Sequence, residues 1–131
     1  MKVLFLDDDT ARIQRVNLII DADIDVTIVS TAAECIDRLK EAEDWDLICL
    51  DHDLGGQVFV NSSREDCGME VVRYLMQYPE RHTASKILVH SWNGYAGNAM
   101  RLSLKTSGYD VDYEPFTGKR DFIRKHAKKG G

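Results

Sequence analysis

The stretch DLICLDHDLGG, residues 46–56, places two carboxylates and an imidazole directly after a short apolar run. A short apolar run of this kind is typical of a strand that is buried on both faces of a parallel sheet. Asp51, His52 and Asp53 are therefore expected where the chain leaves the core. Carboxylates that lose water and approach each other destabilise a fold unless something compensates their charge. The stretch thus predicts a buried strand and a site that holds a cation or ligand at its end.

Apolar runs and helical patterns alternate along the rest of the chain. Thr31 or Ser30 is expected to cap the second helix, and Thr31 is followed three residues later by Glu34, as in a capping box. Thr10 is expected to cap the first helix. The expected strands cover Lys2–Leu6, Asp25–Ser30, Trp45–Leu50, Lys86–His90 and Tyr109–Tyr113. The later helices are expected over Ala32–Glu41, about Cys67–Gln77, Gly97–Thr106 and residues 117–129.

Five alternating units predict an α/β fold with a doubly wound, five-stranded parallel sheet and helices on both faces. A chain of 131 residues is long enough for one domain, expected over residues 1–131 with a basic C-terminal helix at 117–129. Residues 54–66 form an expected extended loop. A connection between a strand and a helix usually takes about 2 to 6 residues, so this loop is a candidate functional segment.

Composition excludes some functions. The net charge of −5 argues against nonspecific duplex binding. Basic residues near the C-terminus predict a solvated helix end or, alternatively, contact with a polyanion. No apolar run reaches the roughly 20 residues that cross a bilayer, and the start MKVLFLDDD does not resemble a signal peptide. Three cysteines without a CxxC spacing predict no disulfide framework, so the expected location is cytoplasmic, with no membrane partner.

The carboxyl ends of the expected strands carry acidic residues. Parallel sheets bind ligands at this edge. Several carboxylates without a lysine among them require a cation, and their oxygens suit Mg²⁺ or Mn²⁺. The candidate metal ligands are Asp7, Asp8, Asp51 and Asp53. For Asp53, capping a turn is an equally good explanation, as is capping the first helix for Asp9.

Two histidines follow neighbouring strands of the expected sheet. Imidazole changes protonation near neutral pH, so His52 and His90 could be a general acid and base beside Asp51. Alternatively, each histidine only donates a hydrogen bond to a carboxylate. The candidate phosphate-binding residues are Ser91, Asn93, Arg64, Gly55 and Gly56. The other two histidines, His82 and His126, are expected at the surface.

The strand ends resemble those of the receiver domains of response regulators. The resemblance implies a strand order of 2-1-3-4-5, a metal-holding acidic pair at Asp7 and Asp8, and a phosphoacceptor at Asp51. It also implies a cis bond between Glu114 and Pro115. Two features depart from the receiver pattern. Receivers have a lysine where this chain has Glu114, and they lack the two strand-end histidines. Loss of that cation predicts weak phosphorylation of Asp51.

The combination of LDD at residue 6, LDHDLG at residue 50 and HSWNGYAGNAM at residues 90–100 is closer to the cyclic-phosphate processing receiver domains. This resemblance implies a metal-dependent site that binds or processes a cyclic phosphate on a nucleotide or RNA end. Whether the site is that of a phosphoesterase stays open. Two alternatives are a signalling receiver phosphorylated at Asp51 and a pseudo-receiver that only binds another protein.

Overall fold

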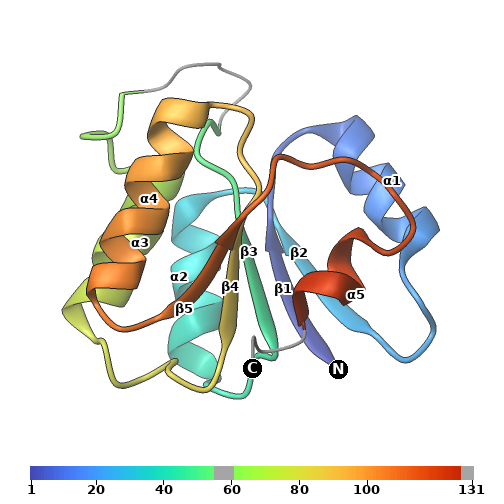
Figure 1. Cartoon of the computed structure of the whole chain (residues 1–131), viewed down its shortest axis with the longest axis horizontal. Helices are drawn as coiled ribbons and strands as arrows, with labels where there is room; N and C mark the ends of the chain where they lie inside the picture. The colour runs from blue at the N-terminus through green and yellow to red at the C-terminus, as the bar shows by residue number, and fades with distance from the viewer. Residues whose placement is uncertain (55–60, 128–131) are drawn as a thin grey trace.

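The computed structural model describes residues 1–54 and 61–127 as a five-stranded parallel sheet in the order β2-β1-β3-β4-β5 (Figure 1). The predicted fold class and strand order are confirmed. The strands are β1 (Lys2–Leu6), β2 (Asp25–Val29), β3 (Leu47–Leu50), β4 (Lys86–Val89) and β5 (Asp110–Tyr113). The helices are α1 (Thr10–Ile19), α2 (Ala32–Glu41), α3 (Gly68–Gln77), α4 (Gly94–Thr106) and α5 (Phe122–Ala127).

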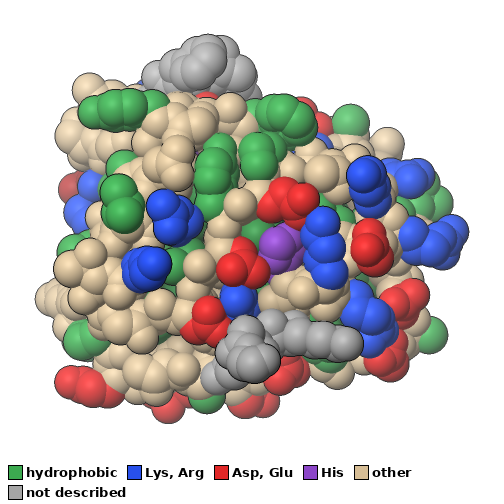
Figure 2. Space-filling view, in the orientation of Figure 1, with side chains coloured by type: hydrophobic (Ala, Val, Ile, Leu, Met, Phe, Trp, Pro, Cys, Tyr) green, Lys and Arg blue, Asp and Glu red, His purple; other side chains and the backbone are tan. Residues whose placement is uncertain are grey.

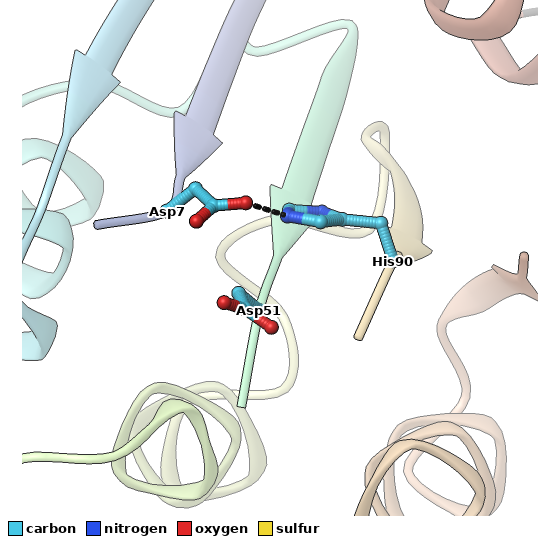
Figure 3. A group of neighbouring side chains, drawn as sticks. All are labelled: Asp7, Asp51 and His90. Atoms are coloured by element: carbon cyan, nitrogen blue, oxygen red, sulfur yellow. Dashed lines mark hydrogen bonds and ion pairs between the residues drawn. The ribbon is translucent and has the colours of Figure 1, made fainter. Parts of the chain in front are cut away.

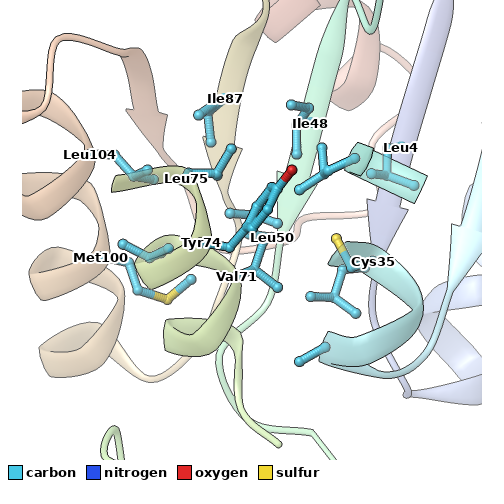
Figure 4. Close-up of a cluster of buried hydrophobic side chains, with 14 of the residues drawn as sticks. Leu4, Cys35, Ile48, Leu50, Val71, Tyr74, Leu75, Ile87, Met100 and Leu104 are labelled. Carbon is cyan, nitrogen blue, oxygen red and sulfur yellow. The ribbon is translucent and has the colours of Figure 1, made fainter. Parts of the chain in front are cut away.

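Alternating side chains of the central strands build two cores, one on each face of the sheet. Leu4 and Leu6 of β1 face a cluster that includes residues of α2, α3 and α4. Val3 and Phe5 of the same strand face a second cluster with α1 and α5. Figure 1 shows this division, and Figure 4 shows the larger cluster. Both faces are buried, which explains why the strands read as continuous apolar runs.

Helix starts follow local hydrogen-bonding chemistry. Thr31 caps α2 as predicted, since its hydroxyl accepts a hydrogen bond from Glu34 N at 3.1 Å. The prediction for α1 is wrong by one residue. Asp9 is the cap and accepts from Arg12 N at 2.9 Å, whereas Thr10 is the first helical residue. Asp9 therefore has the structural role that the sequence left open.

Three further expectations need correction. The last helix begins at Phe122 rather than at residue 117, and it follows a turn in which Gly118 has a φ of 71°. Residues 128 and 129 lie outside the described residues. Helix α4 begins at Gly94, three residues early, because Asn93 caps it. No peptide bond in the described residues is cis, so the Glu114–Pro115 bond is trans, the isomer that X–Pro bonds favour by about 0.5–1 kcal/mol.

Gly68 fixes the position of β3's end relative to α3. Its backbone N–H donates to the His52 carbonyl at 2.9 Å. A Cβ atom built on Gly68 would lie 1.8 Å from the carbonyl oxygen of Asp51. The helix can therefore approach the backbone of Asp51 and His52 this closely only because residue 68 has no side chain.

We predict that Gly68→Ala destabilises the fold, because the new methyl group must push the Asp51 backbone aside. The expected loss is about 3 kcal/mol or more, the upper range for overpacking against a rigid neighbour. Gly94→Ala is a matched control, since its Cβ would meet only the Tyr113 hydroxyl at 3.8 Å. Urea unfolding measures both variants. Equal midpoints for the two would contradict this close approach.

Candidate functional site

Three buried side chains converge at the carboxyl edge of the sheet (Figure 3). Asp7 follows β1, Asp51 follows β3 and His90 follows β4. One potential ligand atom from each lies within 4.8 Å of the others, and all three residues are at most 3% exposed. Parallel strands that end in register place these residues together, as the sequence predicted.

Arg12 supplies a cation that the sequence interpretation missed. It lies in the first turn of α1, and its Nε donates to Asp7 Oδ2 at 2.7 Å while Nη2 donates to Asp7 Oδ1 at 3.1 Å. The same Nη2 lies 3.4 Å from Asp51 Oδ2. The sequence interpretation noted only that no lysine lies among the carboxylates, and it overlooked this arginine. An arginine one turn after the DDD run was the available signal, since a helix starting there turns back over the strand ends.

Four hydrogen bonds surround the Asp7 carboxylate. In addition to the two from Arg12, Oδ2 is 3.1 Å from His90 Nε2 and Oδ1 accepts from Asp9 N at 2.9 Å. Burial alone would raise the pKa of Asp7, but the hydrogen bonds from His90 and Arg12 outweigh it and lower that pKa to about 2. Asp7 is thus a stably ionised group.

Asp51 is poorly compensated by comparison. Its Oδ1 accepts from His52 N at 2.9 Å, and the contact of Oδ2 with Arg12 is long. Burial raises the pKa of Asp51 to about 6, with a further upward contribution from the charge of Asp7, against the lowering charges of His90 and Arg12. An additional cation next to this carboxylate would therefore be stabilising.

The two candidate catalytic histidines are both buried but differ in their contacts. His90 stacks on the Phe5 ring with centroids 4.6 Å apart, and its Nδ1 has no hydrogen-bond partner among the described residues. His52 Nδ1 is 2.8 Å from Asp53 Oδ1, and its Nε2 is 2.9 Å from Ser62 Oγ. Both histidines therefore contact a carboxylate, as the simpler alternative expected, and the second nitrogen of His52 also contacts a hydroxyl.

The other predicted site residues are distributed around this centre. Asp8 and Asp53 are not part of the compact group, and Asp53 accepts from Asn93 Nδ2 at 3.3 Å. Asn93 Oδ1 also caps α4, and the Ser91 hydroxyl oxygen accepts from Asn93 N at 3.0 Å. Arg64 pairs with Asp66 at 2.5 Å. Gly55 and Gly56 lie outside the described residues.

Asp8 borders a hollow beside the acidic cluster, the group formed by Asp7, Asp51 and His90. The hollow has a volume of about 430 Å³ and is lined by Asp8, Ser30, Thr31, Leu54 and Asp66. These residues come from the loops after β1, β2 and β3. Its polar groups are mostly carboxylate acceptors and hydroxyls. Such groups suit the hydroxyl groups of a sugar better than they suit an anion.

Glu114 pairs with two side chains of α5. Its carboxylate lies 2.9 Å from Lys125 Nζ and 2.7 Å from His126 Nε2, while His126 Nδ1 contacts Asp112 at 2.9 Å. The face of the molecule drawn in Figure 2 carries a histidine among acidic and basic side chains. His126 is only partly exposed and His82 is fully buried, so the surface positions expected for both need correction.

No helix in the described part of the chain combines the length and apolar character that a membrane span requires.

Residues 2–106 match a family model described as the cyclic-phosphate processing receiver domain. A comparison with curated protein sequences gave no significant match.

Solved structures share the fold at low sequence identity. The CheY-like response regulator receiver domain protein from Methanospirillum hungatei is 21% identical with a TM-score of 0.62, covering 95% of this chain and 88% of its own. The response regulator TrrA from Thermotoga maritima, in complex with Mg²⁺ and BeF, is 15% identical with a TM-score of 0.66, covering 95% and 93%. A response regulator from Burkholderia pseudomallei, with a phosphorylated aspartic acid, a calcium ion and citrate, is 19% identical with a TM-score of 0.67, covering 97% and 66%.

We predict that Asp51→Asn stabilises the metal-free protein at pH 7 by about 1–3 kcal/mol, because the ionised carboxylate is worse accommodated in the folded than in the unfolded chain. A pKa raised from 3.8 to about 6 means that wild-type stability falls as pH rises through this interval. The gain should therefore shrink as the pH is lowered from 6 to 4. Urea unfolding in the presence of a chelator measures it.

Asp7→Asn should instead lower the free energy of unfolding at pH 7. The pKa of Asp7 is lowered, so its ionised form stabilises the fold. Asp37→Asn, at an exposed position of α2, should change little. A destabilised Asp51→Asn protein at pH 7 would contradict this description of the site.

Proposed function

This chain belongs to the cyclic-phosphate processing receiver domain family, and we propose that its site binds and hydrolyses a cyclic phosphate on a nucleotide or RNA end. The observation that carries the proposal is the convergence of Asp7, Asp51 and His90 at the carboxyl edge, with His52 directly after Asp51. Carboxylates for a cation and imidazoles for proton transfer are the groups that such a hydrolysis needs.

The residues at this edge fit a divalent cation on one condition. Asp51 offers a buried, poorly compensated oxygen, and Asp7 a second carboxylate. The Asp7 oxygens, however, already accept four hydrogen bonds, so a cation there must displace a donor. Arg12 is the easiest to move, because its long side chain is 27% exposed whereas His90 is buried against Phe5. Mg²⁺ or Mn²⁺ thus fits once the guanidinium has left.

In the proposed site, Asp7 and Asp51 hold the cation, with Asp8 as an outer carboxylate. The bound cation would stabilise negative charge on the phosphoryl oxygens. Once displaced from Asp7, Arg12 would remain next to the bound cation as a positive side chain that can pair with the phosphate. It would then replace the lysine that receivers have at the position of Glu114. The bound cation and Arg12 would together offset the negative charge of the carboxylates, so that the site can bind an anionic phosphate.

Hydrolysis requires a nucleophile to attack phosphorus while the bond from phosphorus to one ribose oxygen breaks. A base takes the proton of the nucleophile, and an acid gives a proton to the departing oxygen. Asp53 holds the N–H of His52 at Nδ1, which leaves Nε2 as the proton acceptor. His90 is then the remaining imidazole that can act as the acid. Ser91, Asn93 and Arg64 would orient the phosphate, and the hollow at Asp8 would take the sugar.

The single domain, its segment at 54–66 and the cytoplasmic location are further parts of this proposal. The contact between Ser62 and His52 supports a role for the described part of this segment in the site. The chain could also be phosphorylated at Asp51 by a kinase partner. Residue 114 does not favour this alternative, because Glu114 pairs with Lys125 and His126 instead of bringing a cation toward Asp51.

We predict Mg²⁺- or Mn²⁺-dependent hydrolysis of a 2′,3′-cyclic nucleotide with a bell-shaped pH profile, as expected for an acid–base pair. His90→Gln should lower the rate about 100-fold or more, because it removes one member of the pair. His126→Gln is the control, since this imidazole contacts Asp112 and Glu114 rather than the acidic cluster.

Phosphomonoester release followed by chromatography gives the rates, and calorimetry with MnCl₂ shows whether the metal binds. If the metal binds and yet no cyclic nucleotide or RNA end is bound or hydrolysed, a role in protein interaction becomes the better account.

A further inference from the structure

Ser62, His52 and Asp53 are arranged as a hydrogen-bonded relay, and we propose that Ser62 is a nucleophile activated by this relay toward phosphorus esters. Ser62 Oγ lies 2.9 Å from His52 Nε2, and His52 Nδ1 lies 2.8 Å from Asp53 Oδ1. The inference deepens the proposed function by naming the attacking group, and it rests on that function for the substrate.

The direction of the relay follows from the acceptors. An ionised carboxylate can only accept hydrogen bonds, so the proton of a neutral His52 must lie on Nδ1, facing Asp53. Nε2 then has a free lone pair and accepts the hydrogen bond from the Ser62 hydroxyl. This is the protonation state in which an imidazole can remove the proton of a serine. The same two distances would arise in any serine hydrolase relay, whatever its fold.

The relay is rigidly held on all three members. His52 is fully buried, and its backbone N–H donates to Asp51 Oδ1 at 2.9 Å. Asp53 Oδ1 is also bonded to Asn93 Nδ2. The Ser62 carbonyl accepts from Arg73 Nη1 at 2.7 Å, and Arg73 is in turn oriented by Glu70 at 2.8 Å. A preorganised nucleophile needs this kind of support, because a shift of about 1 Å strongly reduces reactivity.

A second clamp fixes the segment that carries the serine. Arg73 Nη2 donates to the Arg64 carbonyl at 2.7 Å, and Cys67 Sγ contacts the same oxygen at 3.2 Å. The serine is therefore held two residues away on the chain as well as at its own backbone. The position of Ser62 does not depend on its hydroxyl group, so Ser62→Ala should retain the fold.

The proposed reaction has two balanced steps. Ser62 Oγ attacks phosphorus, its proton passes to His52 Nε2, and the bond from phosphorus to one ribose oxygen breaks. The imidazolium or His90 protonates that oxygen, which leaves a phosphodiester between Ser62 and the ribose. Water then attacks the same phosphorus, His52 takes its proton, and the Ser62 oxygen leaves and regains a proton. The product is the phosphomonoester.

Diisopropyl fluorophosphate and p-nitrophenyl acetate test the nucleophile without any natural substrate. In the first, Ser62 Oγ bonds to phosphorus and fluoride leaves; in the second, Oγ takes the acetyl group and nitrophenolate leaves. Intact-protein and peptide mass spectrometry at pH 8 locates the adduct. We expect one adduct on Ser62, with the labelling rate reduced about 100-fold or more in His52→Gln.

Ser63→Ala is the matched control, because Ser63 is exposed and its hydroxyl donates only to Asn61 at 2.8 Å among the described residues. It should label on Ser62 at the wild-type rate, and Ser62→Ala should not label. Absence of an adduct with both reagents, or equal labelling of Ser62 and Ser63, would overturn the inference. Cyclic-nucleotide hydrolysis that persists in Ser62→Ala would also overturn it while leaving the proposed function intact. Labelling of Ser62 without any cyclic-nucleotide hydrolysis would support Ser62 as a nucleophile and would contradict the assignment of a cyclic phosphate as its substrate.

Discussion

The burial of two carboxylates, Asp7 and Asp51, at adjacent strand ends is the constraint on which the rest of the site depends. Like charges in a poorly hydrated place repel each other, and each must be compensated locally. The structure compensates Asp7 almost completely through Arg12 and His90, whereas Asp51 keeps a pKa raised to about 6. The site is therefore asymmetric, with one stable anion and one that is better accommodated when protonated or paired with a cation.

This asymmetry divides the residues into two functional halves. Asp7, His90 and Arg12 of α1 form a hydrogen-bonded network next to the Phe5 ring. Asp51 connects this network to the second half, because its Oδ1 is bonded to the backbone of His52. His52 then continues to Asp53 and Ser62. The two groups of hydrogen-bonded side chains are thus joined through one buried carboxylate and the peptide after it.

Short-range patterns were sufficient to predict the α/β class and the convergence of polar residues at the strand ends, and the resemblance to receiver domains added the strand order. Apolar runs in β1, β3 and β4 stop at polar residues, and parallel strands bring those stops together. Arg12 was missed because its contacts depend on how α1 turns back, which no local pattern states. The Ser62 contact was missed for the same reason, since ten residues separate it from His52. The predicted start of α5 was wrong because the basic run from residue 119 contains no signal for a helix boundary. The turn at Gly118 became evident only from its positive φ in the structure.

The central claim is that this carboxyl edge binds a divalent cation together with a phosphate. Arg12 then leaves the Asp7 carboxylate and pairs with the phosphate. A crystal structure grown with MnCl₂ and inorganic phosphate, measured for the anomalous scattering of manganese, tests it most directly. The account predicts an anomalous peak between the carboxylates of Asp7 and Asp51, with the Arg12 guanidinium turned away from Asp7 and against the phosphate. An Arg12 still bidentate on Asp7, with no anomalous peak at saturating MnCl₂, would contradict it.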